Sequence, residues 1–260
     1  MRFNKFTLII ALVIAGFSVM KYYSSTQVNE ITGEKQHIAL SVDDEINMGL
    51  QSAPQMAQEF GGLHPDMKAQ ALVKEVGNRI VAQSSASRTP YKYNFYLLAD
   101  PNTVNAFALP GGQVFITAAL FSKLENEDQL AGVLGHEVGH VVARHSAERI
   151  AKDQLMQGIV GAVGVAAGDM NTAQVAQVVG SSITMKHGRE QELQSDDLGV
   201  RFMMEAGYDP TQMVGVMEIL EQASGGSRVP EFQSTHPSPA NRVQKIQESI
   251  KKYNGMMKSQ

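Results

Sequence analysis

The chain has 260 residues and a net charge of −4, which is enough length for one large domain or two small ones. It contains no cysteine, which excludes disulfides, thiolate metal ligands and cysteine nucleophiles, so any metal site must use His, Glu or Asp. No basic stretch is interleaved with aromatic residues, and we therefore expect no nucleic-acid partner.

The N-terminus carries an uncharged apolar segment, Phe6 to Met20, between basic residues. This pattern is typical of a cleaved signal peptide or of a retained anchor that contacts the membrane through residues 6–20. The segment is shorter than the roughly 20 residues of a full span. Both interpretations stay open for residues 1–21, with a buried core helix as a third, and residues 22–40 are expected to form a polar tether. Either export interpretation places the body of the chain in the periplasm or on the extracytoplasmic face of the membrane.

Helix and strand signals alternate in the next part of the chain. Helices are expected from Ser41 to Phe60, before two glycines, and from Pro65 to Gln83. Three short strands are expected at 93–98, 105–109 and 113–117, with a Pro-Gly-Gly turn between the last two. These signals predict a small sheet rather than a barrel.

A helix is then expected from the cap residue Asn126, with Gly132, Gly135 and Gly139 in its interior. Each interior glycine costs about 1 kcal/mol relative to alanine. Such a cost indicates the close approach of backbone or metal ligands, or tight helix packing, and both explanations stay open.

The segment 155–168 is apolar and interrupted by glycines, which favours a mobile lid or a packed hairpin, with a membrane-touching segment as the alternative. Further helices are expected at 172–184, 189–206, 210–223 and 239–252. The main domain is therefore predicted over 41–252, followed by a C-terminal tail over 253–260.

The helix that begins at Asn126 carries the sequence His136-Glu137-Val138-Gly139-His140. Residues four apart share a helix face, so His136 and His140 can bind one ion, and Glu137 lies beside it as a base. A random sequence of this composition would contain such a motif about 0.01 times. Zinc is the expected metal, because it activates water at nitrogen and oxygen ligands near neutral pH.

A catalytic zinc usually needs a third protein ligand. The long-spacer pattern would place a histidine at position 146, which is Ser146. The alternative is a carboxylate from a later helix, where Glu192 and Asp196 are four residues apart. Glu192 could bind the metal while Asp196 accepts a hydrogen bond from a ligating histidine. A solvated acidic helix face is the competing explanation.

Four linked motifs over residues 40–252 resemble one zinc metallopeptidase family. They are the His136–His140 motif with Ala143-Arg144-His145, the stretch from Arg189 to Asp196, Ala206-Gly207-Tyr208-Asp209-Pro210, and Asn105-Ala106-Phe107-Ala108-Leu109-Pro110-Gly111-Gly112. The family includes HtpX, the C-a-a-X prenyl-protein protease and the mitochondrial inner-membrane quality-control peptidase. The soluble bacterial envelope branch, typified by BepA and LoiP, is the most similar.

The resemblance implies an α+β, mainly helical gluzincin fold with a small sheet beside the active-site helix, and Glu192 as the third zinc ligand with Asp196 behind it. It implies that Asn105, Ala106, Phe107 and Ala108 form a strand to which substrate can add. It also gives His236 a regulatory or oxyanion role and places Arg242 downstream of it; a histidine capping the last helix is the alternative. The sequence departs from the family pattern at Ser195 and at His187-Gly188, which puts substrate preference in doubt rather than the chemistry.

The resulting hypothesis is a zinc-dependent metalloendopeptidase, with one zinc per subunit, that hydrolyses polypeptides in the cell envelope. Misfolded envelope proteins are the substrates that the resemblance implies. A zinc-masked chaperone or binding module of the same fold is the alternative, and a structural zinc domain is a second. Cleavage inside the membrane is not favoured, because only one apolar N-terminal segment is present.

Overall fold

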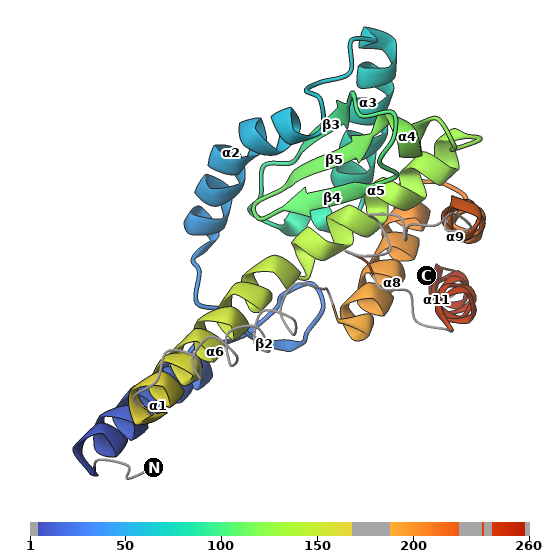
Figure 1. Cartoon of the computed structure of the whole chain (residues 1–260). Coiled ribbons are helices and arrows are strands. Elements are labelled where there is room, and N and C mark those ends of the chain that lie inside the picture. Colours follow the sequence, from blue (N-terminus) through green and yellow to red (C-terminus); the bar gives the residue numbers. More distant parts are fainter. Residues whose placement is uncertain (1–4, 168–187, 224–235, 237–240, 258–260) are drawn as a thin grey trace. The chain divides into compact units, whose positions relative to one another are not determined.

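The computed structural model describes residues 5–167, 188–223, 236 and 241–257, and it divides into two compact units (Figure 1). The first unit comprises 1–41 and 145–187, and the second comprises 42–144 and 188–260. The helix expected at 172–184 lies outside the described residues. The domain boundaries expected from the sequence stay a prediction.

The second unit is built on a three-stranded sheet. Its strands are β3 (Asn94–Leu98), β4 (Ala106–Leu109) and β5 (Gln113–Thr117), in the order β3-β5-β4. The pairing of β3 with β5 is parallel, and that of β4 with β5 is antiparallel. All five residues of the central strand β5 are buried, whereas β4 lies at an edge of this sheet. The three expected strands are confirmed to within one residue at their ends.

The turn between β4 and β5 depends on glycine. Gly111 and Gly112 have φ angles of 77° and 105°, a region that side chains with a Cβ rarely adopt. A Cβ on Gly111 would also collide with the backbone of Ile46 in α2 (Val42–Glu59). The turn is therefore held against the start of α2.

Helices cover the sheet and surround α5 (Glu127–Val142). The helix α3 (Met67–Gln83), capped by the Asp66 side chain, packs on β3, where Gly77 lies against the Phe95 ring. Figure 1 shows α5 between the sheet and the helices α8 (Arg189–Glu205) and α9 (Gln212–Ala223). Every residue of α5 from Gln129 to Val142 is buried, and Asn126 caps it as expected. The remaining elements of this unit are η1 (Ser85–Arg88), α4 (Ala118–Phe121) and α11 (Arg242–Met257). Because α11 continues to Met257, most of the expected tail over 253–260 is helical.

The first unit contains two helices and a hairpin. The helices α1 (Lys5–Ser24) and α6 (His145–Ala167) lie side by side, and β1 (Thr26–Val28) pairs antiparallel with β2 (Lys35–His37). The polar tether expected over 22–40 therefore contains a short hairpin. In its loop, the Asn29 side chain accepts hydrogen bonds from the Ile31 and Thr32 amides. The hairpin expected over 155–168 is wrong for its described part, since α6 is continuous to Ala167. The mobile lid stays a prediction.

The fold class agrees with the sequence analysis. The described residues form a mainly helical α+β structure with small sheets and a buried His/Glu cluster, which fits a metallopeptidase fold.

Candidate metal centre

The site lies where α5 meets α8, and glycines set the separation of these helices. A Cβ on Gly139 would lie 2.9 Å from the carbonyl oxygen of Ser195, and a Cβ on Gly199 would lie 3.1 Å from the amide nitrogen of His136. Side chains at these two positions would push the helix backbones apart. Tight helix packing, one of the two explanations for the α5 glycines, therefore applies at Gly139.

A matched pair of alanine substitutions tests this packing. We expect Gly139→Ala to destabilise the protein by about 1–3 kcal/mol through overpacking and to lower peptidase activity. Gly132→Ala is the control, because its new Cβ would make only ordinary contacts from 3.6 Å outward. That control should be neutral or stabilise by up to about 1 kcal/mol through helix propensity. Urea unfolding and peptide turnover measure both effects, and equal behaviour of the two variants would contradict the packing argument.

Four side chains converge at this junction. His136 and His140 come from α5, Glu192 comes from α8, and His236 approaches from the segment before α11. Each offers a ligand atom within 4.8 Å of the others, and all four residues are buried. The two histidine Nε2 atoms are 3.1 Å apart, and they lie 3.4 Å and 3.5 Å from the carboxylate oxygens of Glu192. His236 Nδ1 lies 3.2 Å from both oxygens of Glu192 and 3.4 Å from His136 Nε2.

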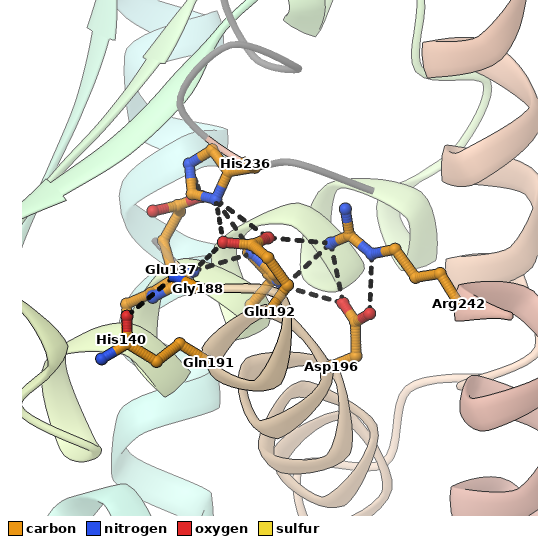
Figure 2. A network of polar contacts seen from close by, with 9 residues as sticks. Glu137, His140, Gly188, Gln191, Glu192, Asp196, His236 and Arg242 are labelled. Atoms are coloured by element: carbon orange, nitrogen blue, oxygen red, sulfur yellow. Dashed lines mark hydrogen bonds and ion pairs between the residues drawn. The ribbon is translucent and has the colours of Figure 1, made fainter. Parts of the chain in front are cut away.

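Asp196 and Arg242 support this cluster from behind. Asp196 Oδ1 lies 2.8 Å from His136 Nδ1, and Arg242 donates to both oxygens of Asp196 at 2.7 Å and 2.9 Å (Figure 2). The positive charge of Arg242 and the hydrogen bond from His136 keep the pKa of Asp196 low despite its burial. An ionised carboxylate only accepts hydrogen bonds, so His136 Nδ1 carries a proton, and the Nε2 atom of the ring faces the cluster.

Glu137 lies beside the four converging residues. Its side chain is 1% exposed, and within the described part of the chain its Oε1 has no hydrogen-bond partner. Figure 2 shows His236 facing both Glu137 and Glu192, and His236 Nε2 lies 3.7 Å from Glu137 Oε1. Burial raises the pKa of Glu137 above its usual value. A buried carboxylate oxygen without a donor is suited to accept a proton from a bound water.

The electrostatics of the cluster favour a positive charge at its centre. Burial alone would lower the pKa of His136, but Asp196 and Glu192 outweigh it and raise that pKa to about 9. Burial would raise the pKa of Glu192, yet its hydrogen bonds with His136 and His236 hold it well below the usual range. The cluster therefore stabilises positive charge, and its imidazole nitrogens and single carboxylate are the kinds of ligand that bind a divalent cation such as zinc. The residues therefore fit a metal ion.

The predicted substrate strand is β4 together with the residue before it. Ala106, Phe107 and Ala108 lie in the edge strand, which is in contact with α5, and Phe107 stacks on Phe115 of β5 at 4.9 Å. Asn105 precedes the strand and is buried, and its amide nitrogen donates to Thr117 Oγ1 at 3.1 Å. The edge position agrees with strand addition, and the substrate role itself stays a prediction.

A partly buried ion pair just after α5 could not be predicted from the sequence. Arg144 donates from Nε and Nη2 to Glu45 Oε1 at 3.0 Å and 2.8 Å, and the Tyr91 hydroxyl donates to Glu45 Oε2. Arg144 has a φ of 56°, a conformation that usually favours glycine after a helix. The contacts of the arginine side chain therefore explain why this residue is found there. The pairing partners are 99 positions apart, and no local pattern reveals them.

Comparison with known proteins decides the family. The sequence model that describes "Peptidase family M48" matches residues 67–250 of the chain, a stretch that includes the whole cluster from His136 to Arg242. The chain belongs to peptidase family M48. It is therefore a metallopeptidase, and the resemblance seen in its motifs is confirmed.

Named relatives of this M48 peptidase come from mitochondria and bacteria. Mitochondrial metalloendopeptidase OMA1 of Schizosaccharomyces pombe is 32% identical over 250 residues, covering 95% of this chain and 73% of the relative. Beta-barrel assembly-enhancing protease of Yersinia pestis is 33% identical over 224 residues, covering 81% and 45%. Metalloprotease YcaL of Escherichia coli is 30% identical over 182 residues, covering 69% and 67%. The chain spans about half the length of the beta-barrel assembly-enhancing proteases that it matches.

Proposed function

We propose that this M48 peptidase is a zinc-dependent endopeptidase in which His136, His140 and Glu192 hold the metal. The observation that carries the proposal is the spacing of their donor atoms. Nitrogen and oxygen ligands at about 2.0–2.2 Å from a tetrahedral zinc lie about 3.3–3.6 Å from one another. The Nε2 atoms of His136 and His140 are 3.1 Å apart, and they lie 3.4 Å from Oε2 and 3.5 Å from Oε1 of Glu192, respectively. A ligand set of two imidazoles and one carboxylate, without cysteine, is typical of catalytic rather than structural zinc sites.

When bound, zinc makes water more acidic and polarises the carbonyl of the scissile bond. Glu137 then accepts a proton from the attacking water and passes it to the leaving amine nitrogen. Its burial supports this role, since a raised pKa brings a carboxylate closer to the pH at which it must both accept and release a proton. Asp196 and Arg242 keep His136 in the tautomer that presents Nε2, as the 2.8 Å contact to Nδ1 supports.

His236 has a regulatory role in this proposal. Its Nδ1 belongs to the same group of potential ligands as His136, His140 and Glu192. A fourth protein donor fills the position that catalytic zinc sites leave open for water and substrate. The arrangement described here is thus a resting one, and turnover requires His236 to leave the group. The proximity of His236 to the other three residues is also the observation that favours the alternative function, a zinc-masked binding module with rare turnover.

The proposed substrates are polypeptides of the cell envelope, with the catalytic unit on the extracytoplasmic side of a membrane. Support comes from the similarity to relatives named beta-barrel assembly-enhancing protease and from the apolar helix α1. Addition of an extended substrate to the β4 edge would supply backbone hydrogen bonds without a strict sequence requirement. Such binding suits misfolded chains, which expose extended segments.

Metal analysis and chelation test the assignment. The purified chain should contain one zinc per molecule, lose peptide cleavage on chelation, and regain it when zinc is added back. His136→Ala should abolish zinc retention, because it removes one of three ligands. His64→Ala, at a histidine outside the group, is the control. Absence of stoichiometric zinc, together with unchanged activity of His136→Ala, would refute the metal assignment. Unfolding on chelation before any loss of activity would instead indicate a structural zinc.

A further inference from the structure

The helix α1 exposes an apolar surface that the described residues of the first unit do not cover. Large apolar side chains along it are 60–68% exposed, namely Phe6, Ile9, Leu12, Val13, Phe17 and Met20, and only Ala11 is buried. Among the described residues, α1 is the one helix long and apolar enough to cross a membrane. Its 20 residues correspond to about 30 Å, the thickness of a bilayer core. An apolar surface of this kind in water would be a site of association.

The helix α6 packs along α1 in an antiparallel arrangement (Figure 1). Lys21 donates to the Gln154 side chain at 3.3 Å, and Ser18 lies directly against Gly158. Ala11 and Ala162 are buried. Small residues at a helix contact let the backbones approach closely, which is the packing mode of helices in lipid. Gly158 therefore allows close contact between α6 and α1, and the helix continues through it.

The charged parts of the two helices end at the same level. On α6 the charges of Glu148, Arg149, Lys152 and Asp153 come first, and Gln154–Ala167 carries none. On α1 the segment Phe6–Met20 is uncharged and Lys21 follows it. Because Lys21 is hydrogen-bonded to Gln154, the two uncharged segments begin side by side. From there both extend toward the N-terminal end of α1. Two adjacent helices have no need of this register in water, whereas a bilayer surface requires it.

Aromatic residues mark the same level. Tyr22 and Tyr23 directly follow Lys21, and Tyr22 stacks on His37 of the β1–β2 hairpin with ring centroids 4.1 Å apart. Tyrosine is enriched where a protein passes from hydrocarbon to water, because its ring is apolar and its hydroxyl is polar. The hairpin thus lies at the polar end of the helix pair.

We propose that α1 is retained in the working protein and inserts into a lipid bilayer together with Gln154–Ala167 of α6. The uncharged part of α6 is about 21 Å long, too short to cross alone, so it enters the bilayer as a partner of α1. The charged first turns of α6 and the β1–β2 hairpin stay at the membrane surface. Removal of α1 as a signal peptide would leave the Gly158 and Ala162 side of α6 without its partner. The proposal is independent of the metal chemistry.

Cysteine labelling tests this proposal directly, because the chain contains no cysteine of its own. Single cysteines are placed at Leu12, at Val163 and, as the control, at Lys152, whose side chain is 51% exposed. The full chain is reconstituted in phosphatidylethanolamine–phosphatidylglycerol vesicles and treated with a membrane-impermeant maleimide. We expect Leu12→Cys and Val163→Cys to react at least about tenfold more slowly than Lys152→Cys, because the reagent does not enter hydrocarbon. Detergent should remove the difference.

Three results would overturn the proposal. If Val163→Cys reacts as fast as Lys152→Cys while Leu12→Cys is protected, α1 alone is embedded. An N-terminus that begins beyond Lys21 in protein isolated from membranes would show that α1 is cleaved. If Val163→Cys is protected but cross-links to a second copy, and the protein is released from vesicles at alkaline pH, a protein partner covers the helix. A disulfide between Ser18→Cys and Gly158→Cys in membranes would support the retained pair.

Discussion

Replacing Glu137 by glutamine is expected to reduce casein cleavage by about 10²–10⁴-fold without loss of the metal. Glutamine has nearly the same size and still fits the buried site, but it cannot accept a proton from water. Glu137 is outside the group of four potential ligands, so the zinc content should not change. Turnover under saturating substrate and metal content measured on the same preparation separate the two effects.

Glu75→Gln is the matched control for this change. Glu75 lies on the exposed side of α3, so the same chemical substitution should leave turnover and unfolding unaltered. Equal casein cleavage by wild type and Glu137→Gln would exclude Glu137 as the base. Cleavage that is negligible already in the wild type, with tight binding of unfolded casein by both proteins, would favour the zinc-masked binding module.

Replacing Arg242 by methionine is expected to destabilise the protein by about 3–5 kcal/mol, because two buried carboxylates lose their cation. Arg242 is 3% exposed, bonds both oxygens of Asp196 and lies 3.6 Å from Glu192. Methionine fills similar space, so the loss of stability reflects the missing charge and hydrogen bonds rather than a cavity. Urea unfolding of the chelated protein measures it without a contribution from bound metal.

An exposed ion pair on the same helix provides the control. Lys245 and Glu248 are 2.6 Å apart, which is as close as Arg242 and Asp196 at 2.7 Å. Water already solvates both of these groups, so Lys245→Met should leave the unfolding midpoint unchanged. Arg242→Lys should recover part of the lost stability, since it restores the charge but not the two-pronged geometry. A midpoint for Arg242→Met within error of that for Lys245→Met would disprove the structural role of the buried cation.

Local chemistry made much of this protein predictable from its sequence. Asn126 and Asp66 cap their helices because short polar side chains accept hydrogen bonds from free amides. The Pro-Gly-Gly turn fixed the two later strands, since only glycine tolerates the positive φ angles found there. The spacing of four residues brought His136 and His140 together on one face of α5. The family motif pointed to Glu192, which the structure places beside both histidines.

The features that escaped prediction depend on contacts between distant parts of the chain. The glycines of α6 suggested breaks, because helix propensity describes an isolated helix. At Gly158 the neighbouring helix α1 needs the space that a side chain would fill. Likewise, the pairing of Glu45 with Arg144 joins a helix start to the end of another, and neither residue has a local pattern that reveals it. The division into two units also follows from packing. The first unit combines residues 1–41 with residues 145–187, which lie before and after the sheet in the sequence.

The Arg144–Glu45 pair has a mechanical consequence. Arg144 stands between His140 and α6 along the chain, and its side chain is bound to α2 by two hydrogen bonds. Tension applied along α6 would reach this residue before it reaches α5, because Arg144 lies between the two helices in the chain. The hydrogen bonds from Arg144 to Glu45 would pass that load into α2 and so preserve the spacing of His136 and His140. The two histidines can then keep their separation of 3.1 Å while the helix that follows them is under force.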